Sequence, residues 1–236
     1  MMEFSCSLVS ESDRRTTVGL IVLQADETIE QDFRRLFAAD ACDFFVSRVP
    51  SGLEVTPETL AAMADDMTAA AELFPRSARF DVVGYGCTSG TSVIGAERVA
   101  ALVKQGCAAV AVTEPVSALI HACRARKITR LAFLSPYIAT VSDRLRAVLA
   151  DSGIETPEFG SFNEAEEAKV ARISAGSIVD AAETLANAGT VDGVFLSCTN
   201  LNALDVLEEI SSRTGKPAMS SNSVLAEHMR DLAGIA

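Results

Sequence analysis

The sequence predicts an α/β protein built from two pseudo-symmetric, Rossmann-like lobes, each a parallel sheet flanked by helices, with a ligand-binding cleft between them. Short apolar runs alternate with amphipathic stretches along all 236 residues. Most of these runs are apolar throughout, which is typical of parallel strands covered by helices on both faces. The order of elements in the first half also returns in the second half, which indicates two similar lobes.

The strands are expected at the short runs rich in Val, Ile, Leu and Phe. They cover residues 17–23, 43–49, 80–86, 107–112, 129–134, 191–197 and 217–220. The helices are expected at the amphipathic stretches between the strands. They cover residues 27–40, 57–74, 92–105, 115–125, 138–151, 164–188, 201–213 and 223–233. Pro57 stands in the first turn of the second helix, where its missing N–H is tolerated.

The clearest internal repeat surrounds two cysteines. The segment DVVGYGCTSG at 81–90 has a counterpart in DGVFLSCTNL at 192–201, so that Cys87 and Cys198 are 111 residues apart. Chance similarity between two α/β halves would explain the order of strands, but it would not place Cys-Thr at the same point in both. The repeat therefore predicts one cysteine in each lobe.

This repeat also predicts where the lobes divide. The first lobe is expected over residues 1–120 and the second over residues 121–236, with the last helix free to pack back on the first lobe. Ligands of open parallel sheets bind at the carboxyl ends of the strands. Both cysteines are therefore expected in the cleft between the lobes.

Composition and charge exclude several classes of function. The 32 acidic and 20 basic residues give a net charge of −12, whereas nucleic-acid binding needs a basic surface. No run approaches the roughly 20 apolar residues that cross a bilayer, and the first residues do not resemble a signal peptide. We therefore expect a cytoplasmic protein with no nucleic-acid or membrane partner; a homo-oligomer is compatible with this composition.

Cysteine usage indicates thiol chemistry rather than disulfides or metal binding. The six cysteines contain no CxxC pair and no zinc-ligand spacing, so no metal is expected. Cys87 and Cys198 each follow a predicted strand. The residues directly after them are Thr88 and Ser89 in the first lobe and Thr199 and Asn200 in the second. Backbone N–H groups at a helix start bind carboxylates and lower a thiol pKa, so we expect a carboxylate ligand and activated thiols.

Two thiols that face one carbon from opposite sides can exchange its proton. One thiolate removes the proton from one face, and the other thiol returns a proton to the opposite face. Alternatively, one thiolate adds to a double bond and allows rotation. Neither reaction needs a cofactor, and none is predicted.

A near match to a dinucleotide-binding motif overlaps the first cysteine. Gly84, Gly86 and Gly90 resemble G-x-G-x-x-G, and Glu114 stands downstream like a ribose-binding acid. However, the third glycine is one position late, and the strand is the third of the chain. We therefore reject a dinucleotide cofactor.

The stretches around the cysteines resemble a known family. CTSGTSVIG (87–95), SCTNL (197–201) and GKPAMSSNSVLAEH (215–228) are similar to the maleate isomerase and arylmalonate decarboxylase branch of the aspartate/glutamate racemase superfamily. VGLIV (18–22) and LSPY (134–137) add weaker support. Within that branch the chain looks closest to maleate cis–trans isomerases and to racemase-like proteins of ectoine-utilisation clusters.

The resemblance implies roles for individual residues. Cys87 and Cys198 match the paired catalytic cysteines, of which the decarboxylases keep only the second. The residues that match substrate-binding positions are Thr88, Ser89, Tyr137, Asn163 and Thr199, with Asn200 beside them. The resemblance therefore implies a cofactor-independent isomerase acting on a small carboxylate. Asn222 is expected only to cap the last helix.

The chain departs from the family at one position. The isomerases follow their first strand with Pro-Ser-Ser-Asn, whereas this chain has Leu23-Gln24-Ala25-Asp26. Asp26 either caps the helix expected at 27–40 or faces the cleft. In the cleft, its carboxylate would repel a dianion such as maleate and favour a substrate with an ammonium or neutral polar group.

These observations predict an isomerase or racemase that acts beside a carboxylate, maleate isomerase-like and with a role in ectoine degradation. An amino-acid racemase of the Asp/Glu type is the alternative within the same chemistry. A non-catalytic module that binds a small metabolite is the alternative from another class. The reactivity of the two thiols distinguishes an enzyme from a binding module.

Overall fold

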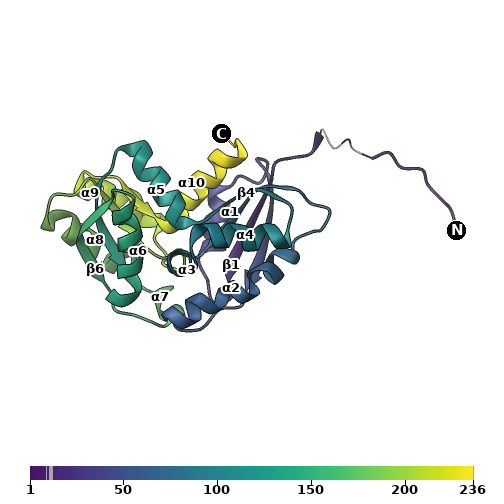
Figure 1. Ribbon diagram of the computed structural model, residues 1–236. Helices are drawn as coiled ribbons and strands as arrows, with labels where there is room; N and C mark the ends of the chain where they lie inside the picture. Colours follow the sequence, from purple (N-terminus) through teal and green to yellow (C-terminus); the bar gives the residue numbers. More distant parts are fainter. Residues whose placement is uncertain (9, 11–12, 236) are drawn as a thin grey trace.

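The fold consists of two lobes that each hold a twisted parallel sheet (Figure 1). The structure is a computed structural model that describes residues 1–8, 10 and 13–235. Among these residues, the first sheet has the order β2-β1-β3-β4 and the second the order β6-β5-β7-β8, with every strand pair parallel. The predicted class of two Rossmann-like lobes is therefore confirmed.

The strands and helices alternate along the chain as expected from the apolar runs. The strands are β1 (Thr17–Leu23), β2 (Asp43–Val49), β3 (Phe80–Gly86), β4 (Ala109–Thr113), β5 (Arg130–Ser135), β6 (Glu155–Ser161), β7 (Gly193–Leu196) and β8 (Ala218–Ser220). The helices are α1 (Ile29–Leu36), α2 (Pro57–Glu72), α3 (Thr88–Ile94), α4 (Ala96–Gly106), α5 (Pro115–Arg126), α6 (Ala139–Asp151), α7 (Glu167–Val170), α8 (Ala175–Ala188), α9 (Leu207–Thr214) and α10 (Ser221–Ala233), with a 3-10 turn at Leu204–Val206.

Two helices cross from one lobe to the other. α5 follows the last strand of the first sheet but packs its Val116 and Leu119 with Phe133 and Phe195 of the second sheet. α10 follows the last strand of the second sheet but buries Met229 among strands of the first. The two helices also pack against each other (Figure 1). This exchange ties the lobes together. Residue 120 lies inside α5, and the division at residues 120 and 121 stays a prediction.

The glycines that resemble a nucleotide-binding motif serve helix packing instead. A Cβ on Gly84 would lie 2.4 Å from Met229 Sδ of α10, and a Cβ on Gly86 would lie 2.6 Å from Ile29 Cδ1 of α1. Both distances are shorter than any van der Waals contact, so these positions need glycine for α1 and α10 to approach β3. No phosphate-binding role is required to explain the GYG sequence.

The structure contains one strand that was not expected and divides two of the expected helices. The edge strand β6 was missed because its sequence, ETPEFGS, lacks an apolar run and contains a proline, which edge strands tolerate. The helix expected at 92–105 is two helices, because Gly95 has a φ of 94° and ends α3. The helix expected at 164–188 divides into α7 and α8, with Ser174 capping the second by accepting from Ser177 N–H.

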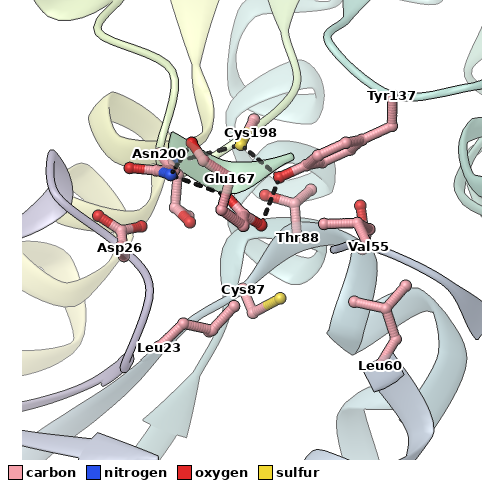
Figure 2. Close-up of a pocket in the computed structure, with 12 residues that line it drawn as sticks. Leu23, Asp26, Val55, Leu60, Cys87, Thr88, Tyr137, Glu167, Cys198 and Asn200 are labelled. Atoms are coloured by element: carbon pink, nitrogen blue, oxygen red, sulfur yellow. Dashed lines mark hydrogen bonds between the residues drawn. The ribbon is translucent and has the colours of Figure 1, made fainter. Parts of the chain in front are cut away.

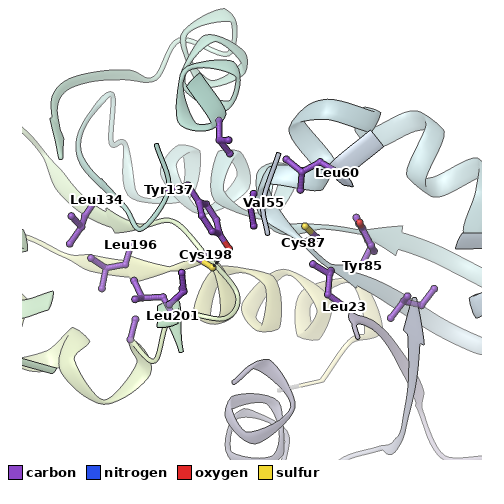
Figure 3. Close-up of a cluster of buried hydrophobic side chains, with 14 of the residues drawn as sticks. Leu23, Val55, Leu60, Tyr85, Cys87, Leu134, Tyr137, Leu196, Cys198 and Leu201 are labelled. Carbon is purple, nitrogen blue, oxygen red and sulfur yellow. Dashed lines mark hydrogen bonds between the residues drawn. The ribbon is translucent and has the colours of Figure 1, made fainter. Parts of the chain in front are cut away.

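A continuous apolar core lines both sides of the interlobe space. Leu23, Val55 and Leu60 come from the first lobe, and Leu134 and Leu201 come from the second. Figure 3 shows these side chains around the two cysteines. No helix of the described residues is both long and apolar enough to span a membrane.

One glycine gives a stability prediction for the packing of α4 on α2. A Cβ on Gly106 would lie 2.4 Å from the Thr68 carbonyl oxygen and 2.7 Å from Ala71 Cβ. Gly106→Ala should therefore lower the free energy of unfolding by about 1–3 kcal/mol, because the backbone must shift. Chemical denaturation measures this. As the control, Gly176→Ala in α8 meets nothing within 4 Å and should raise it by about 0.5–1 kcal/mol; equal effects would contradict the packing.

Candidate active site

A small cavity lies between the lobes, at the carboxyl ends of the central strands (Figure 2). Its walls are formed by Leu23, Asp26, Val55, Leu60, Cys87, Thr88, Ser89, Tyr137, Glu167, Cys198, Thr199 and Asn200. The space open to the centre of a water molecule is about 10 Å³, which is room for about one water. The structure is thus a closed form, and a carboxylate ligand requires the walls to move apart.

The first cysteine stands at the junction of β3 and α3. Cys87 is the N-cap of α3, and its Sγ accepts a hydrogen bond from Gly90 N–H at 3.1 Å. A Cβ on Gly90 would lie 2.8 Å from the Cys87 sulfur. A glycine at this position therefore lets the first turn of α3 close around the thiol.

The second cysteine occupies a loop after β7. Cys198 Sγ accepts from Asn200 N–H at 3.2 Å and lies 3.0 Å from Tyr137 Oη. No helix starts here, since the 3-10 turn begins at Leu204 and α9 at Leu207. The expected helix over 201–213 was therefore wrong at its start, and the thiol–amide contact is made by the loop alone.

Burial favours the protonated form of both thiols. Burial raises the pKa of Cys87 to about 12, against the lowering effect of the Gly90 N–H. Burial also raises the pKa of Cys198 well above its usual value, and the negative charge of Glu167 adds to this. The sequence-based expectation of lowered thiol pKa values was wrong for this closed form, because desolvation of the thiolates outweighs the backbone donors.

A hydrogen-bonded chain connects Cys198 to a buried acid. Tyr137 Oη donates to Glu167 Oε1 at 2.9 Å, and Asn200 Nδ2 donates to Glu167 Oε2 at 2.7 Å. The tyrosine hydroxyl has only one hydrogen, so Cys198 must be the donor in its contact with Tyr137. A proton can move from Cys198 through Tyr137 to Glu167 when the carboxylate is ionised.

Sequence analysis missed Glu167. Its position falls inside the helix expected at 164–188, where an acid is normally a solvent-facing residue. In the structure, α7 turns its first residue into the cavity, and burial raises the Glu167 pKa. The turn before α7 contains Asn163, which has a φ of 55°. A break in the apolar periodicity after residue 170 was the signal that one long helix did not fit.

Asp26 both binds the start of a helix and lines the cavity. Its Oδ1 accepts from the N–H groups of Thr28, the N-cap of α1, and of Ile29, the first residue of α1, each at 2.8 Å. Its Oδ2 is buried and has no hydrogen-bond partner among the described residues. The nearby Thr199 hydroxyl donates instead to Gly86 O at 3.2 Å. Burial raises the Asp26 pKa, although these N–H groups and Thr199 oppose the shift.

Hydrogen bonds between the lobes hold the two cysteine loops in place. Besides the Thr199 contact, Thr28 Oγ1 donates to Asn200 O at 2.9 Å, and Thr88 Oγ1 donates to Ser221 Oγ at 2.8 Å. These residues belong to segments more than 100 positions apart in the chain. The relative position of the thiols is therefore fixed by polar contacts as well as by the apolar core.

Two loops cover the cavity from opposite lobes. Val55 N–H donates to Ala165 O, and Glu167 N–H donates to Leu53 O, both at 3.1 Å. Glu54 and Glu166 form an isolated antiparallel bridge between these contacts. The loop before α2 therefore pairs with the segment that carries Glu167.

The structure brings together most of the residues that sequence analysis selected. The residues that line the cavity are Asp26, Cys87, Thr88, Ser89, Tyr137, Cys198, Thr199 and Asn200. Asn163 is exposed and is not among the residues that line the cavity, whereas Glu167, which was not predicted, is one of them. Asn222 does not cap α10: Ser220 is the cap, and Asn222 Nδ2 donates to Thr199 O and Asp32 Oδ2.

The fold and cavity define a two-lobed α/β protein with paired buried thiols, and the comparisons with known proteins agree. A model of the arylmalonate decarboxylase family matches residues 18–234. The arylmalonate decarboxylase of Bordetella bronchiseptica is 29% identical over 209 residues, 87% of this chain and 85% of the relative. A maleate isomerase of Pseudomonas putida is 25% identical over 219 residues, 86% of each.

Solved structures agree with the fold. A variant of the Nocardia farcinica maleate cis–trans isomerase, with a covalently bound succinylcysteine intermediate, has a TM-score of 0.83 at 23% identity and covers 93% of both chains. The chain belongs to the arylmalonate decarboxylase family, whose relatives here include maleate isomerases. The resemblance found in the sequence is thereby confirmed.

Proposed function

We propose that this chain is a cofactor-independent isomerase or racemase that acts at the carbon next to a carboxylate of a small substrate. The observation that carries the proposal is that Cys87 and Cys198, from separate lobes, line one closed cavity. In Figure 2 they lie on opposite sides of the cavity, with the ends of Glu167 and Tyr137 between them. This arrangement suits two groups that approach one carbon from two faces.

For a racemisation, one cysteine starts as the thiolate. It takes the proton from the carbon, and the electron pair of the broken C–H bond stays on the carbon and spreads into the neighbouring carboxylate. The other cysteine, as the thiol, then gives its proton to the opposite face and becomes the thiolate. One proton is lost and one is gained, so no oxidant or cofactor takes part.

For a cis–trans isomerisation, the same groups act on a double bond. One thiolate forms a C–S bond at one carbon while the other thiol protonates the adjacent carbon. Rotation about the new single bond and reversal of both steps give the trans product. The succinylcysteine of the Nocardia farcinica variant is a covalent adduct of that protein, and we propose an analogous adduct here as the second route.

The chain from Cys198 through Tyr137 to Glu167 supplies the negative charge that either route needs. Desolvation disfavours an isolated thiolate at Cys198, and it also disfavours an isolated carboxylate at Glu167. One charge shared along the chain lowers this cost because Tyr137 can donate to whichever end is ionised. We propose that substrate binding decides where the proton resides.

The substrate's reacting carboxylate is proposed to bind beside the cysteine loops. The N–H groups of Thr88 and Ser89 stand in the first turn of α3, where the helix offers them no carbonyl partner. The Ser89 hydroxyl and the loop at Thr199 and Asn200 complete this side. The Thr88 hydroxyl donates to Ser221, so its backbone rather than its side chain is the donor we assign to the substrate.

Two other functions remain candidates. The relative with 29% identity is a decarboxylase, although by the family resemblance decarboxylases lack the first of the two cysteines. A non-catalytic module would bind the same carboxylates without turnover. A role in ectoine degradation, in the cytoplasm, follows from the resemblance alone, and a reducing compartment would keep both thiols free.

Solvent deuterium exchange tests the proposal. The protein is incubated in D₂O with maleate and with C4–C6 amino, hydroxy and N-acyl carboxylates, and proton NMR follows the signals. We expect at least one compound to lose the C–H signal beside its carboxylate, or maleate-type signals to become fumarate-type. Loss of carbon dioxide instead would assign the decarboxylase reaction. Binding without any spectral change would assign the binding module.

A further inference from the structure

Two buried acids share the cavity without a cation to balance them. Asp26 and Glu167 are each only 4% exposed, and none of the cavity-lining residues is Lys, Arg or His. The positive charge of Arg48 opposes the rise of the Asp26 pKa. Its guanidinium donates to the carbonyl oxygens of Leu23 and Asp26 and pairs with Glu30, so it does not reach into the cavity.

The Asp26 carboxyl presents an unused oxygen to this space. Oδ1 is engaged by two backbone N–H groups, whereas Oδ2 is buried without a partner among the described residues. A buried polar atom that lacks a partner normally destabilises the fold by about 1–3 kcal/mol. A donor supplied by a ligand would remove this cost.

Glu167 is placed to share the same donor. Its two oxygens accept from Tyr137 and Asn200, and each carboxylate oxygen can accept a further hydrogen bond. Asp26 and Glu167 line the same cavity, and the negative charge of Asp26 contributes to the raised pKa of Glu167. Figure 2 shows the Asp26 carboxyl at one edge of the cavity and the Glu167 carboxyl nearer its centre. A positive group between them would relieve the repulsion.

We propose, on the basis of the function proposed above, that Asp26 and Glu167 bind the ammonium group of the substrate. The substrate is then a small amino carboxylate: its carboxylate lies by the cysteine loops, and its amino group lies between the two acids. A dicarboxylate would instead bring a second negative charge to a site that already holds two acids. The site therefore selects against dianions of the same length.

Ligands that differ only at one end test this selection. Succinate and 4-aminobutyrate are four-carbon chains that share a carboxylate at one end. At the other end, succinate carries a second carboxylate and 4-aminobutyrate carries an ammonium group. Butyrate has no charge at that end. Isothermal titration at pH 7.5, or protection of Cys87 and Cys198 from iodoacetamide, gives their relative affinities. We expect 4-aminobutyrate to bind at least tenfold more tightly than succinate, with butyrate between them.

Amide variants should reverse this order. Asp26→Asn keeps an oxygen that can accept from the N–H groups of Thr28 and Ile29. Glu167→Gln keeps an oxygen that can accept from Asn200. Each variant removes one negative charge. In each variant the preference for 4-aminobutyrate over succinate should fall at least fivefold, and in the double variant succinate should bind more tightly. The control is Asp32→Asn, which removes a buried acid outside the cavity and should leave the preference unchanged.

Two results would overturn the ammonium site. Succinate that binds the wild type as tightly as 4-aminobutyrate would mean that the acids are protonated and donate to a second carboxylate. A preference that survives in the double variant would place the selection elsewhere. Because the readout is binding, these results are independent of turnover: a charge preference without deuterium exchange would keep the ammonium site and reject the proposed catalysis.

Discussion

Replacing either Cys87 or Cys198 with alanine should lower kcat/KM by about 10²–10⁴-fold, the usual contribution of a positioned proton-transfer group. The reason is that each thiol serves one face of the reacting carbon, so the loss of either thiol leaves one face without its proton-transfer group. Turnover of the compound that exchanges in D₂O, followed by NMR, measures the effect. The double variant should be no worse than the more impaired single variant, because the two thiols act as a unit.

Cys123 provides a matched control for these variants. It is fully buried, like the two site cysteines, but belongs to the core of the second lobe. Cys123→Ala should leave kcat/KM within about twofold of the wild type. If Cys87→Ala retained wild-type turnover while Cys198→Ala lost it, the reaction would need only one thiol, as the resemblance implies for the decarboxylases.

Replacing Tyr137 with phenylalanine should lower kcat/KM by about 10–100-fold, equivalent to one hydrogen bond to a charged group. The change removes the hydroxyl that contacts both Glu167 Oε1, at 2.9 Å, and Cys198 Sγ, at 3.0 Å. Without it, the charge cannot be shared between acid and thiol. The pH dependence of kcat should also shift, because Cys198 and Glu167 then titrate separately.

The control for Tyr137→Phe is Ser142→Ala, which removes a buried hydroxyl outside the cavity. Ser142 lies in α6, is buried, and its Oγ has no hydrogen-bond partner among the described residues. It does not line the cavity. Ser142→Ala should leave both the rate and its pH dependence unchanged. A Tyr137→Phe variant with the same pH profile as the wild type would show that Tyr137 only packs against the site.

The sequence was sufficient to predict the strands that form the centre of each sheet. β1 and β3 have the expected bounds because most of their residues are apolar, and every residue of both strands except Asp81 is buried. The edge strand β6 was not predictable in this way, since only one of its seven residues is buried. The break at Gly95 depends on a positive φ, which the residue type permits but does not require.

The residues of the candidate site that could be predicted are those that belong to short sequence motifs. The Cys-Thr repeat pointed to both thiols, and the departure at Asp26 pointed to one acid of the cavity. Glu167 was not predictable, because its burial depends on the pairing of its segment with the loop at Leu53. The predicted direction of the thiol pKa shifts was wrong for a related reason. The sequence indicates which backbone N–H groups lie near each thiol, but it does not indicate that the opposite lobe buries the thiols.

The most direct test of the two-thiol account is a crystal structure of a complex. The Cys198→Ser variant, slowed but unchanged in shape, would be crystallised with the compound that exchanges in D₂O. The account predicts that the reacting carbon lies between position 198 and the Cys87 sulfur, each in van der Waals contact with an opposite face. A ligand whose reacting carbon touches only one of these positions, or which lies outside the cavity, would contradict it.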